Sequence, residues 1–141
     1  MDLDATVSAM TVSDNNKRLV LRAFQPWEMG NSKPFFDLIA EDVTWTVIGT
    51  TAVSGIYHSK KEIVDKAFGP LLGRLEGLLT ARLVDIAAEG EKVFLRFESN
   101  GAGRTGIQYN QTYCFAMVMR GDRIIEITAY LDTELLARIF T

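Results

Sequence analysis

The chain has 141 residues, the length of one domain, and its 48% hydrophobic and 23% charged residues are ordinary for a globular protein. This composition excludes a disordered chain or a collagen-like repeat, and the formal net charge of −3 argues against nucleic acid as a partner. The single cysteine and single histidine exclude an intramolecular disulfide, a cysteine-rich zinc site and a site of several histidines, so no metal is expected.

The N-terminal segment, residues 1–12, carries two aspartates and no basic start, unlike a secretory signal. No stretch approaches the roughly 20 apolar residues of a membrane span. We therefore expect a cytoplasmic protein without a membrane partner. We also predict that residues 1–12 form a flexible extension and that residues 13–141 form one domain.

A helix is predicted over about residues 14–29, with Ser13 as its N-cap. Pro26 should loosen its last turn, and Gly30 marks its end. A second, short helix follows over about residues 32–40. The apolar residues of the first helix recur at helical spacing: Leu19, Val20, Ala23, Phe24 and Trp27.

A strand is predicted over residues 43–48, with Val43, Trp45 and Val47 on one face. A short strand near residues 56–57 then leads into a third helix over about residues 60–72. Ser59 followed by Glu62 is a capping box that starts this helix.

The second half of the chain predicts strands joined by hairpins, over residues 79–88, 93–98, 107–119 and 124–131. A glycine-rich loop is expected over residues 100–106. Asp132 should cap a short last helix over about residues 135–140. This order of elements predicts an α+β fold with a curved, mostly antiparallel sheet.

Three strings, at residues 38–45, 55–63 and 121–133, resemble the nuclear transport factor 2-like superfamily, and within it the SnoaL-like and ketosteroid isomerase-related proteins. Ser59 replaces the second glycine of the middle string. The resemblance, which covers about residues 13–141, implies a cone-shaped, cystatin-like fold in which a strongly curved sheet wraps around helices. It also implies a hydrophobic pocket and a homodimer. The fold hosts isomerases, cyclases, hydrolases and non-catalytic binders, so it does not identify the reaction.

Arg96 and Glu98 are the first candidates for chemistry, because residues two apart on a strand project to the same face. In one interpretation they face solvent and the opposite face of the strand is core. In the other they line the pocket, where an apolar surrounding raises a carboxyl pKa and fits it for acid or base catalysis. The opposite, apolar face would then pair two subunits: Val93, Leu95 and Phe97, with Met117 and Met119 on the next strand. The resemblance favours the second interpretation, because related limonene epoxide hydrolases carry an arginine and a carboxylate at this spacing in the pocket.

Other active-site residues of those relatives are replaced here. Ala129 stands where the hydrolases carry a second aspartate, and Trp45 and Val47 stand where they carry a tyrosine and an asparagine that position water. In the pattern of the ketosteroid isomerases, Val47 is near the general base and Phe24 replaces a tyrosine of the oxyanion hole. Neither mechanism is therefore expected.

Tyr109, Gln111 and Tyr113 share a face of the long strand, where they either line the pocket and bond a ligand oxygen or pack across the sheet. The expected ligand-binding residues, which would equally suit a plain core, are Phe24, Trp27, Trp45, Val47, Phe68, Gln111, Phe115, Ile127, Ala129 and Leu131.

Two functions remain open. The first is a cofactor-independent isomerase, cyclase, lyase or hydrolase acting on a hydrophobic cyclic or polyketide-like substrate. Glu98 would be its acid or base, Arg96 would orient Glu98 and stabilise an oxyanion, and Tyr113 would donate a hydrogen bond. The second is a non-catalytic ligand-binding or assembly module with the same pocket, which the small number of expected polar groups suits better.

Overall fold

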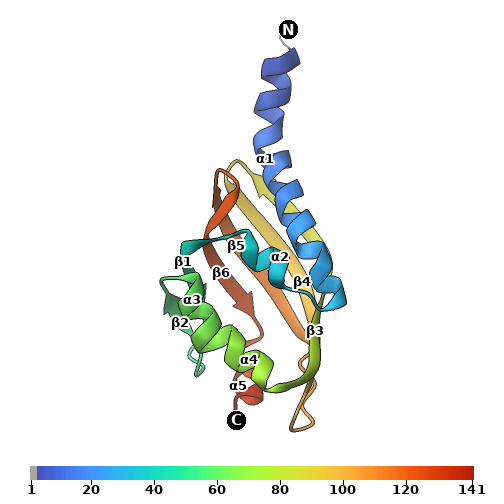
Figure 1. Cartoon of the computed structure of the whole chain (residues 1–141), viewed down its shortest axis with the longest axis vertical. Helices are drawn as coiled ribbons and strands as arrows, with labels where there is room; N and C mark the ends of the chain where they lie inside the picture. The colour runs from blue at the N-terminus through green and yellow to red at the C-terminus, as the bar shows by residue number, and fades with distance from the viewer. Residues whose placement is uncertain (1–2) are drawn as a thin grey trace.

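The computed structural model describes residues 3–141, and from Val12 onward it also describes the side chains. The chain forms helices first, then two strands, a helical segment, four long strands and a last helix (Figure 1). This is the α+β architecture that the sequence predicts. No helix among the described residues is long and apolar enough to cross a membrane.

The first helix, α1 (Leu3–Phe24), begins well before the predicted start at residue 14. Residues 3–12 are its first turns, and they project past the end of the sheet in Figure 1. Ser13 therefore lies inside the helix, and its predicted role as N-cap is wrong. Its Oγ instead accepts a hydrogen bond of 2.8 Å from the backbone N–H of Gly90, to whose carbonyl Asn16 donates. These bonds hold α1 against a turn of the sheet.

The α-helix ends at Phe24, and the chain continues as a 3₁₀ helix, η1 (Gln25–Met29). The last turn of the predicted helix is thus loosened at Pro26, as expected. Gly30 ends it at a φ of +89°, where a side chain would be strained and would also meet Leu78. The second helix, α2 (Lys33–Asp37), is shorter than predicted, because the backbone from Leu38 onward bonds to strand β6 instead.

One six-stranded sheet contains all the strands, in the spatial order β2-β1-β6-β5-β4-β3. Neighbours are antiparallel except β1 and β6, which are parallel. The strands are β1 (Ile39–Val47), β2 (Gly55–Tyr57), β3 (Leu75–Glu89), β4 (Lys92–Gly103), β5 (Gln111–Arg120) and β6 (Arg123–Leu131).

Strand β4 continues through part of the predicted glycine-rich loop, because Gly103 still pairs with Leu75 of β3. A Cβ on Gly103 would lie 2.2 Å from the carbonyl oxygen of Ile107, so only glycine allows this close return of the chain. Strand β5 starts at Gln111, four residues later than predicted.

The predicted third helix is divided into three pieces: α3 (Lys60–Ile63), a π-helical turn η2 (Val64–Phe68) and α4 (Gly69–Gly73). Ser59 caps α3 as expected, since its Oγ accepts from the N–H of Glu62 at 3.0 Å. Pro70 has no N–H to donate back along the helix, which is a local cause of the widened turn before it. The last helix, α5 (Thr133–Ile139), is capped by Asp132, as predicted.

The helices cover the concave face of the sheet, and this face holds the core. Val93, Leu95 and Phe97 of β4 are fully buried on it, whereas Phe94, on the outer face, is 42% exposed. Met117 and Met119 of β5 are buried on the same concave face. The prediction that these apolar residues pair two subunits is therefore wrong, because they are already buried inside a single chain.

We predict that Phe97→Ala lowers the free energy of unfolding by about 3–5 kcal/mol, because it leaves a cavity in place of a fully buried ring. Phe94→Ala, three residues away on the outer face, should change it by about 1 kcal/mol or less. Urea unfolding monitored by circular dichroism measures both values. Equal losses would contradict the assignment of the two faces.

Candidate functional site

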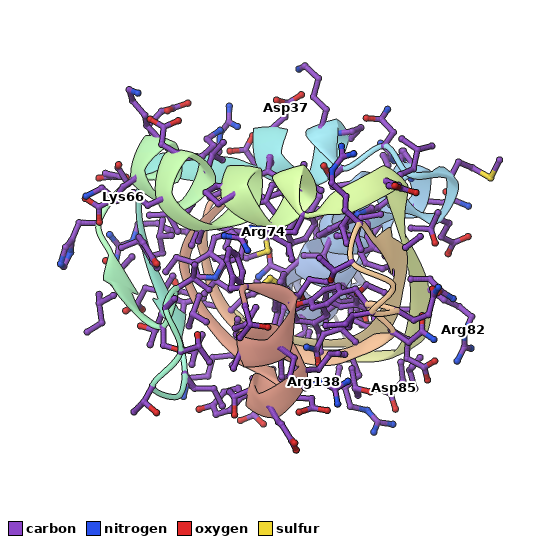
Figure 2. All side chains as sticks on the ribbon, turned by 90° about the horizontal axis from the view of Figure 1, so that it is seen from below. Asp37, Lys66, Arg74, Arg82, Asp85 and Arg138 are labelled. Carbon is purple, nitrogen blue, oxygen red and sulfur yellow. The ribbon has the colours of Figure 1, made fainter. Side chains whose placement is uncertain are left out.

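A cavity of about 60 Å³ lies inside the concave face of the sheet, near the end where α4 and α5 meet the open edge of the cone. Figure 2 views this end from below, with α4 above and α5 below. The cavity wall consists of Trp27, Phe36, Trp45, Val47, Val53, Ile63, Ala67, Phe68, Leu71, Leu79, Tyr113, Phe115, Ala129, Leu131, Leu136 and Phe140.

Packed aromatic rings form the inner part of the wall. Trp45 stacks on Phe36 at a centroid distance of 5.8 Å and meets Phe115 edge to face at 5.4 Å. Trp27 meets Phe68 at right angles, at 6.0 Å. Such pairs contribute about 0.5–1.5 kcal/mol each beyond the area they bury, so these rings are held in defined positions.

The outer part of the wall depends on the C-terminal helix. Leu136 of α5 and Phe140, just after it, close one side of the cavity. Arg74, which follows α4, places its guanidinium carbon 4.9 Å from the centroid of the Phe140 ring. This cation–π contact joins the two helical segments that flank the cavity, and Figure 2 shows Arg74 between them.

A buried polar chain runs from the cavity wall to the start of α5. The hydroxyls of Tyr113 and Tyr109 lie 2.7 Å apart, and Gln111 Nε2 donates to the Tyr109 hydroxyl at 3.4 Å. Gln111 also binds the backbone of Asp132 twice: Nε2 donates to its carbonyl at 2.9 Å, and Oε1 accepts from its N–H at 2.8 Å. The N-cap residue of α5 is thus tied to the strand that carries Tyr113.

Burial raises the pKa of Tyr109 and raises that of Tyr113 well above the usual tyrosine value. Loss of solvation is the main cause for both phenols, since the charged form cannot be hydrated there. Both groups therefore stay protonated near neutral pH. They serve as hydrogen-bonding groups and not as bases.

The two cavity tryptophans differ in their hydrogen bonding. The indole N–H of Trp27 donates to the carbonyl of Leu79 at 3.2 Å. The indole N–H of Trp45 is buried and has no acceptor among the described residues. An unsatisfied buried donor costs about 1–3 kcal/mol of folding free energy.

Eight of the residues predicted for the pocket lie in its wall: Trp27, Trp45, Val47, Phe68, Tyr113, Phe115, Ala129 and Leu131. Phe24, Ile127 and Gln111 are buried outside the wall, which corrects their prediction as ligand-binding residues. Phe24 packs behind the wall against Phe35 and Phe97, and the amide of Gln111 is occupied by the backbone of Asp132.

The structure also corrects the position of Arg96 and Glu98. Both lie on the outer face of the sheet, where Arg96 forms a bidentate pair with Asp85 at 2.8 and 2.7 Å. Glu98 pairs with Arg82 at 3.0 Å, and its side chain is 49% exposed. Figure 2 shows Arg82 and Asp85 on the outside of the molecule. Because Phe97 between them points into the core, Arg96 and Glu98 must point outward, away from the cavity.

Half of the wall was not predicted as pocket from the sequence: Phe36, Val53, Ile63, Ala67, Leu71, Leu79, Leu136 and Phe140. A signal existed for Ile63, Ala67 and Leu71, which recur every four residues and share a helix face. No local pattern marks Phe140, which reaches the cavity only because α5 folds back over the sheet end.

The wall contains no carboxylate, histidine or thiol among the described side chains. Elsewhere in residues 12–141, no group of three or more His, Cys, Asp or Glu side chains is placed to hold a metal ion. The fold and the site together define a protein with a curved sheet around a small, apolar, aromatic-walled cavity.

The chain belongs to the SnoaL-like domain family, because the sequence model of that family matches residues 20–127. No curated protein matches the chain by sequence comparison.

Solved structures of NTF2-like proteins share the fold. An NTF2-like protein from Burkholderia thailandensis is 22% identical, with a TM-score of 0.73 over 88% of this chain and 95% of that one. TerC, co-crystallised with polyporic acid, is 14% identical, with a TM-score of 0.72 over 89% and 98%. A Jannaschia protein described as a SnoaL-like polyketide cyclase is 12% identical, with a TM-score of 0.69 over 89% and 90%. The family match confirms the predicted SnoaL-like membership, and the solved structures confirm the predicted fold.

The raised tyrosine pKa values predict a loss of stability at alkaline pH. Above the pKa of an unfolded tyrosine, about 10, the folded protein binds more protons than the unfolded chain, so stability falls as pH rises. We expect the free energy of unfolding to be level to about pH 9 and to fall above about pH 10.

Tyr113→Phe should make this alkaline decrease shallower, because it removes one of the buried tyrosines whose pKa is raised. Urea unfolding at a series of pH values measures the slope. Tyr130→Phe, at an exposed position on the outer face, is the matched control. An identical slope in wild type and Tyr113→Phe would show that Tyr113 ionises as readily in the folded as in the unfolded protein.

Proposed function

We propose that this protein binds a small hydrophobic molecule in the cavity, as a non-catalytic ligand-binding member of its family. The observation that carries the proposal is the wall itself, which is aromatic and aliphatic apart from three polar side-chain groups. Pockets that bind small molecules combine such apolar walls with a few well-placed polar groups.

The alternative, an acid–base enzyme, depended on Glu98 and Arg96 in the pocket. Their outward position removes the base and its partner from that mechanism. Of the predicted catalytic residues only Tyr113 lies in the wall, and its raised pKa suits it to donate a hydrogen bond.

The size of the cavity bears on the kind of ligand. Its volume, about 60 Å³, is below the roughly 300–1,000 Å³ of pockets for drug-sized molecules and below the ~150 Å³ of a cavity that holds benzene. A ring compound therefore requires wall side chains to move. Phe140 is the first candidate, since it follows α5 and closes one side of the cavity. The co-crystallisation of TerC with polyporic acid supports a cyclic ligand for this fold.

Tryptophan fluorescence tests this proposal directly, because the protein has only two tryptophans and both line the cavity. Titration with ethylbenzene should change the emission in a saturable way. Ala129→Leu, which fills part of the wall, should weaken binding at least about tenfold, the equivalent of roughly 1.4 kcal/mol.

The control carries the same substitution outside the cavity. Ala137→Leu, at an exposed position on α5, should bind ethylbenzene like the wild type. The proposal fails if no saturable change occurs or if the two leucine variants behave alike.

We also propose a homodimer, now through the outer face of the sheet. Phe94 and Tyr130 are 42% and 49% exposed there, and Ala116 and Thr128 continue the row from Phe94 across the sheet. The same face carries the Arg96–Asp85 pair, so it presents both charge signs to a copy of itself.

Phe94→Asp should therefore convert the dimer to a monomer of 15.7 kDa in light scattering, because a carboxylate would be buried without a partner in the interface. Thermal unfolding checks that the variant is folded. A wild-type protein that is already 15.7 kDa at micromolar concentration would sink the dimer proposal.

A further inference from the structure

The last helix, α5, is firmly attached to the sheet at its start. The side-chain amide of Gln111 binds the backbone of the N-cap residue Asp132 twice: Nε2 donates to the carbonyl at 2.9 Å, and Oε1 accepts from the N–H at 2.8 Å. Gln111 is only 1% exposed, so the strand that carries it holds this amide in place. The start of α5 is therefore a fixed point.

The C-terminal turn of α5 has no comparable attachment. Its hydrogen bonds stay within the helix: the N–H of Phe140 donates to the carbonyl of Ala137, and Thr141 donates to the carbonyl of Arg138 from both its N–H and its hydroxyl. Among the described residues, no other helix or strand packs along the length of α5. The helix is thus tied down by hydrogen bonds at one end and held by side chains alone at the other.

Two kinds of side-chain contact hold the free end. Leu135, Leu136 and Ile139 are buried, at 8%, 3% and 3% exposed, and burial of this kind is strong but non-directional. The second contact is specific: the guanidinium carbon of Arg74 lies 4.9 Å from the centroid of the Phe140 ring. In the part of the chain that the structure describes, this is the one charged or polar contact between the C-terminal turn of α5 and another element.

We propose that α5 is a lid over the cavity, hinged at Asp132 and latched by Arg74 on Phe140. Leu136 and Phe140 both belong to the cavity wall, so an outward turn of α5 removes one side of it. The closed cavity, of about 60 Å³, is smaller than the roughly 150 Å³ that holds benzene, and this movement supplies the missing space. The entry of a ligand rests on the proposed binding function, whereas the movement of α5 does not.

The other helical cover of the cavity, from Lys60 to Gly73, is held more tightly. Its first residue, Lys60, donates from Nζ to the carbonyl of Phe36 at 2.9 Å. In its middle, the ring of Phe68 packs on Phe36 at a centroid distance of 4.7 Å and on Trp27 at 6.0 Å. This cover is therefore attached along its length, and α5 is the element that can leave the cavity without disrupting the aromatic core.

The lid is closed most of the time, because opening exposes the buried side chains of Leu136 and Ile139 to water. A helix of seven residues is not stable by itself in water, so α5 loses its internal hydrogen bonds when it leaves the sheet. Its amide protons then exchange with solvent. The proposal therefore predicts a local opening of residues 136–140 that does not require global unfolding.

Hydrogen exchange followed in ¹H–¹⁵N spectra measures this opening. After correction for intrinsic rates, the amides of residues 136–140 in the wild type should exchange at least about tenfold faster than those in the middle of β5, and with a weaker dependence on urea. Equal protection and an equal urea dependence would show that α5 opens only when the whole protein unfolds, which would overturn the proposal.

The latch is tested by substitution. Arg74→Gln should raise the exchange rates of residues 136–140 about two- to fivefold, the loss of one exposed cation–π contact, and leave the middle of β5 unchanged. In a Phe140→Leu background the same substitution should add nothing, because the ring is already absent. Arg120→Gln, at an exposed position at the end of β5, is the matched control and should leave the rates of α5 unchanged. An equal effect of Arg74→Gln in both backgrounds would exclude Phe140 as its partner and overturn the latch.

The affinity for ethylbenzene then tests whether the lid serves the cavity. If the ligand displaces α5, Arg74→Gln should bind it about two- to fivefold more tightly than the wild type does, because the latch no longer opposes opening. An unchanged or weaker affinity would overturn the role of the lid in binding. If ethylbenzene binds to neither protein, the proposed binding function fails, and the exchange rates still decide whether α5 is a lid.

Discussion

The position of one ring, Phe97, determines much of this structure. It lies at 4.8–5.6 Å from four other aromatic rings, those of Phe24, Trp27, Tyr113 and Phe115, which come from α1, η1 and β5. Through these contacts the first helical segment is packed onto the middle of the sheet. Since side chains alternate along a strand, placing Phe97 inward also places Arg96 and Glu98 outward. The same contact therefore builds the core and removes the ion-pairing residues from the cavity.

The polar chain through Tyr113, Tyr109 and Gln111 has a comparable role for the wall. Gln111 is 1% exposed and uses its amide to bind the backbone of Asp132, where α5 begins. The helix that supplies Leu136 and Phe140 is thus anchored to the strand that supplies Tyr113.

The chemistry of the cavity follows from the side chains that the strands place in its wall. Strands β1, β5 and β6 contribute Trp45, Val47, Phe115 and Ala129 to the wall. Among the described side chains, the wall contains no carboxylate, which suits ligand binding better than proton abstraction.

Much of the fold was predictable from local sequence patterns, because the interactions behind those patterns lie within a few residues of one another. The alternation of strands β4 and β6, the Ser59 and Asp132 caps, and the stop at Gly30 all depend on backbone geometry within a few residues. The resemblance to a known family added the cone-shaped fold with its strongly curved sheet. Boundaries that depend on distant pairing were missed: β1 begins at Ile39 because it pairs with β6, more than 80 residues later.

The candidate site likewise has features that were predictable from the sequence and features that depend on tertiary contacts. By itself the sequence determined that β4 has one apolar and one charged face, and that Trp45, Phe115 and Tyr113 belong to a shared apolar surface. It did not determine which face of β4 is inside, because either assignment satisfies strict alternation. Only the tertiary structure decided this, by burying Phe97 among rings from three elements. Phe140 likewise joined the cavity only through the return of the C-terminal helix, a contact between segments that no short stretch of sequence contains.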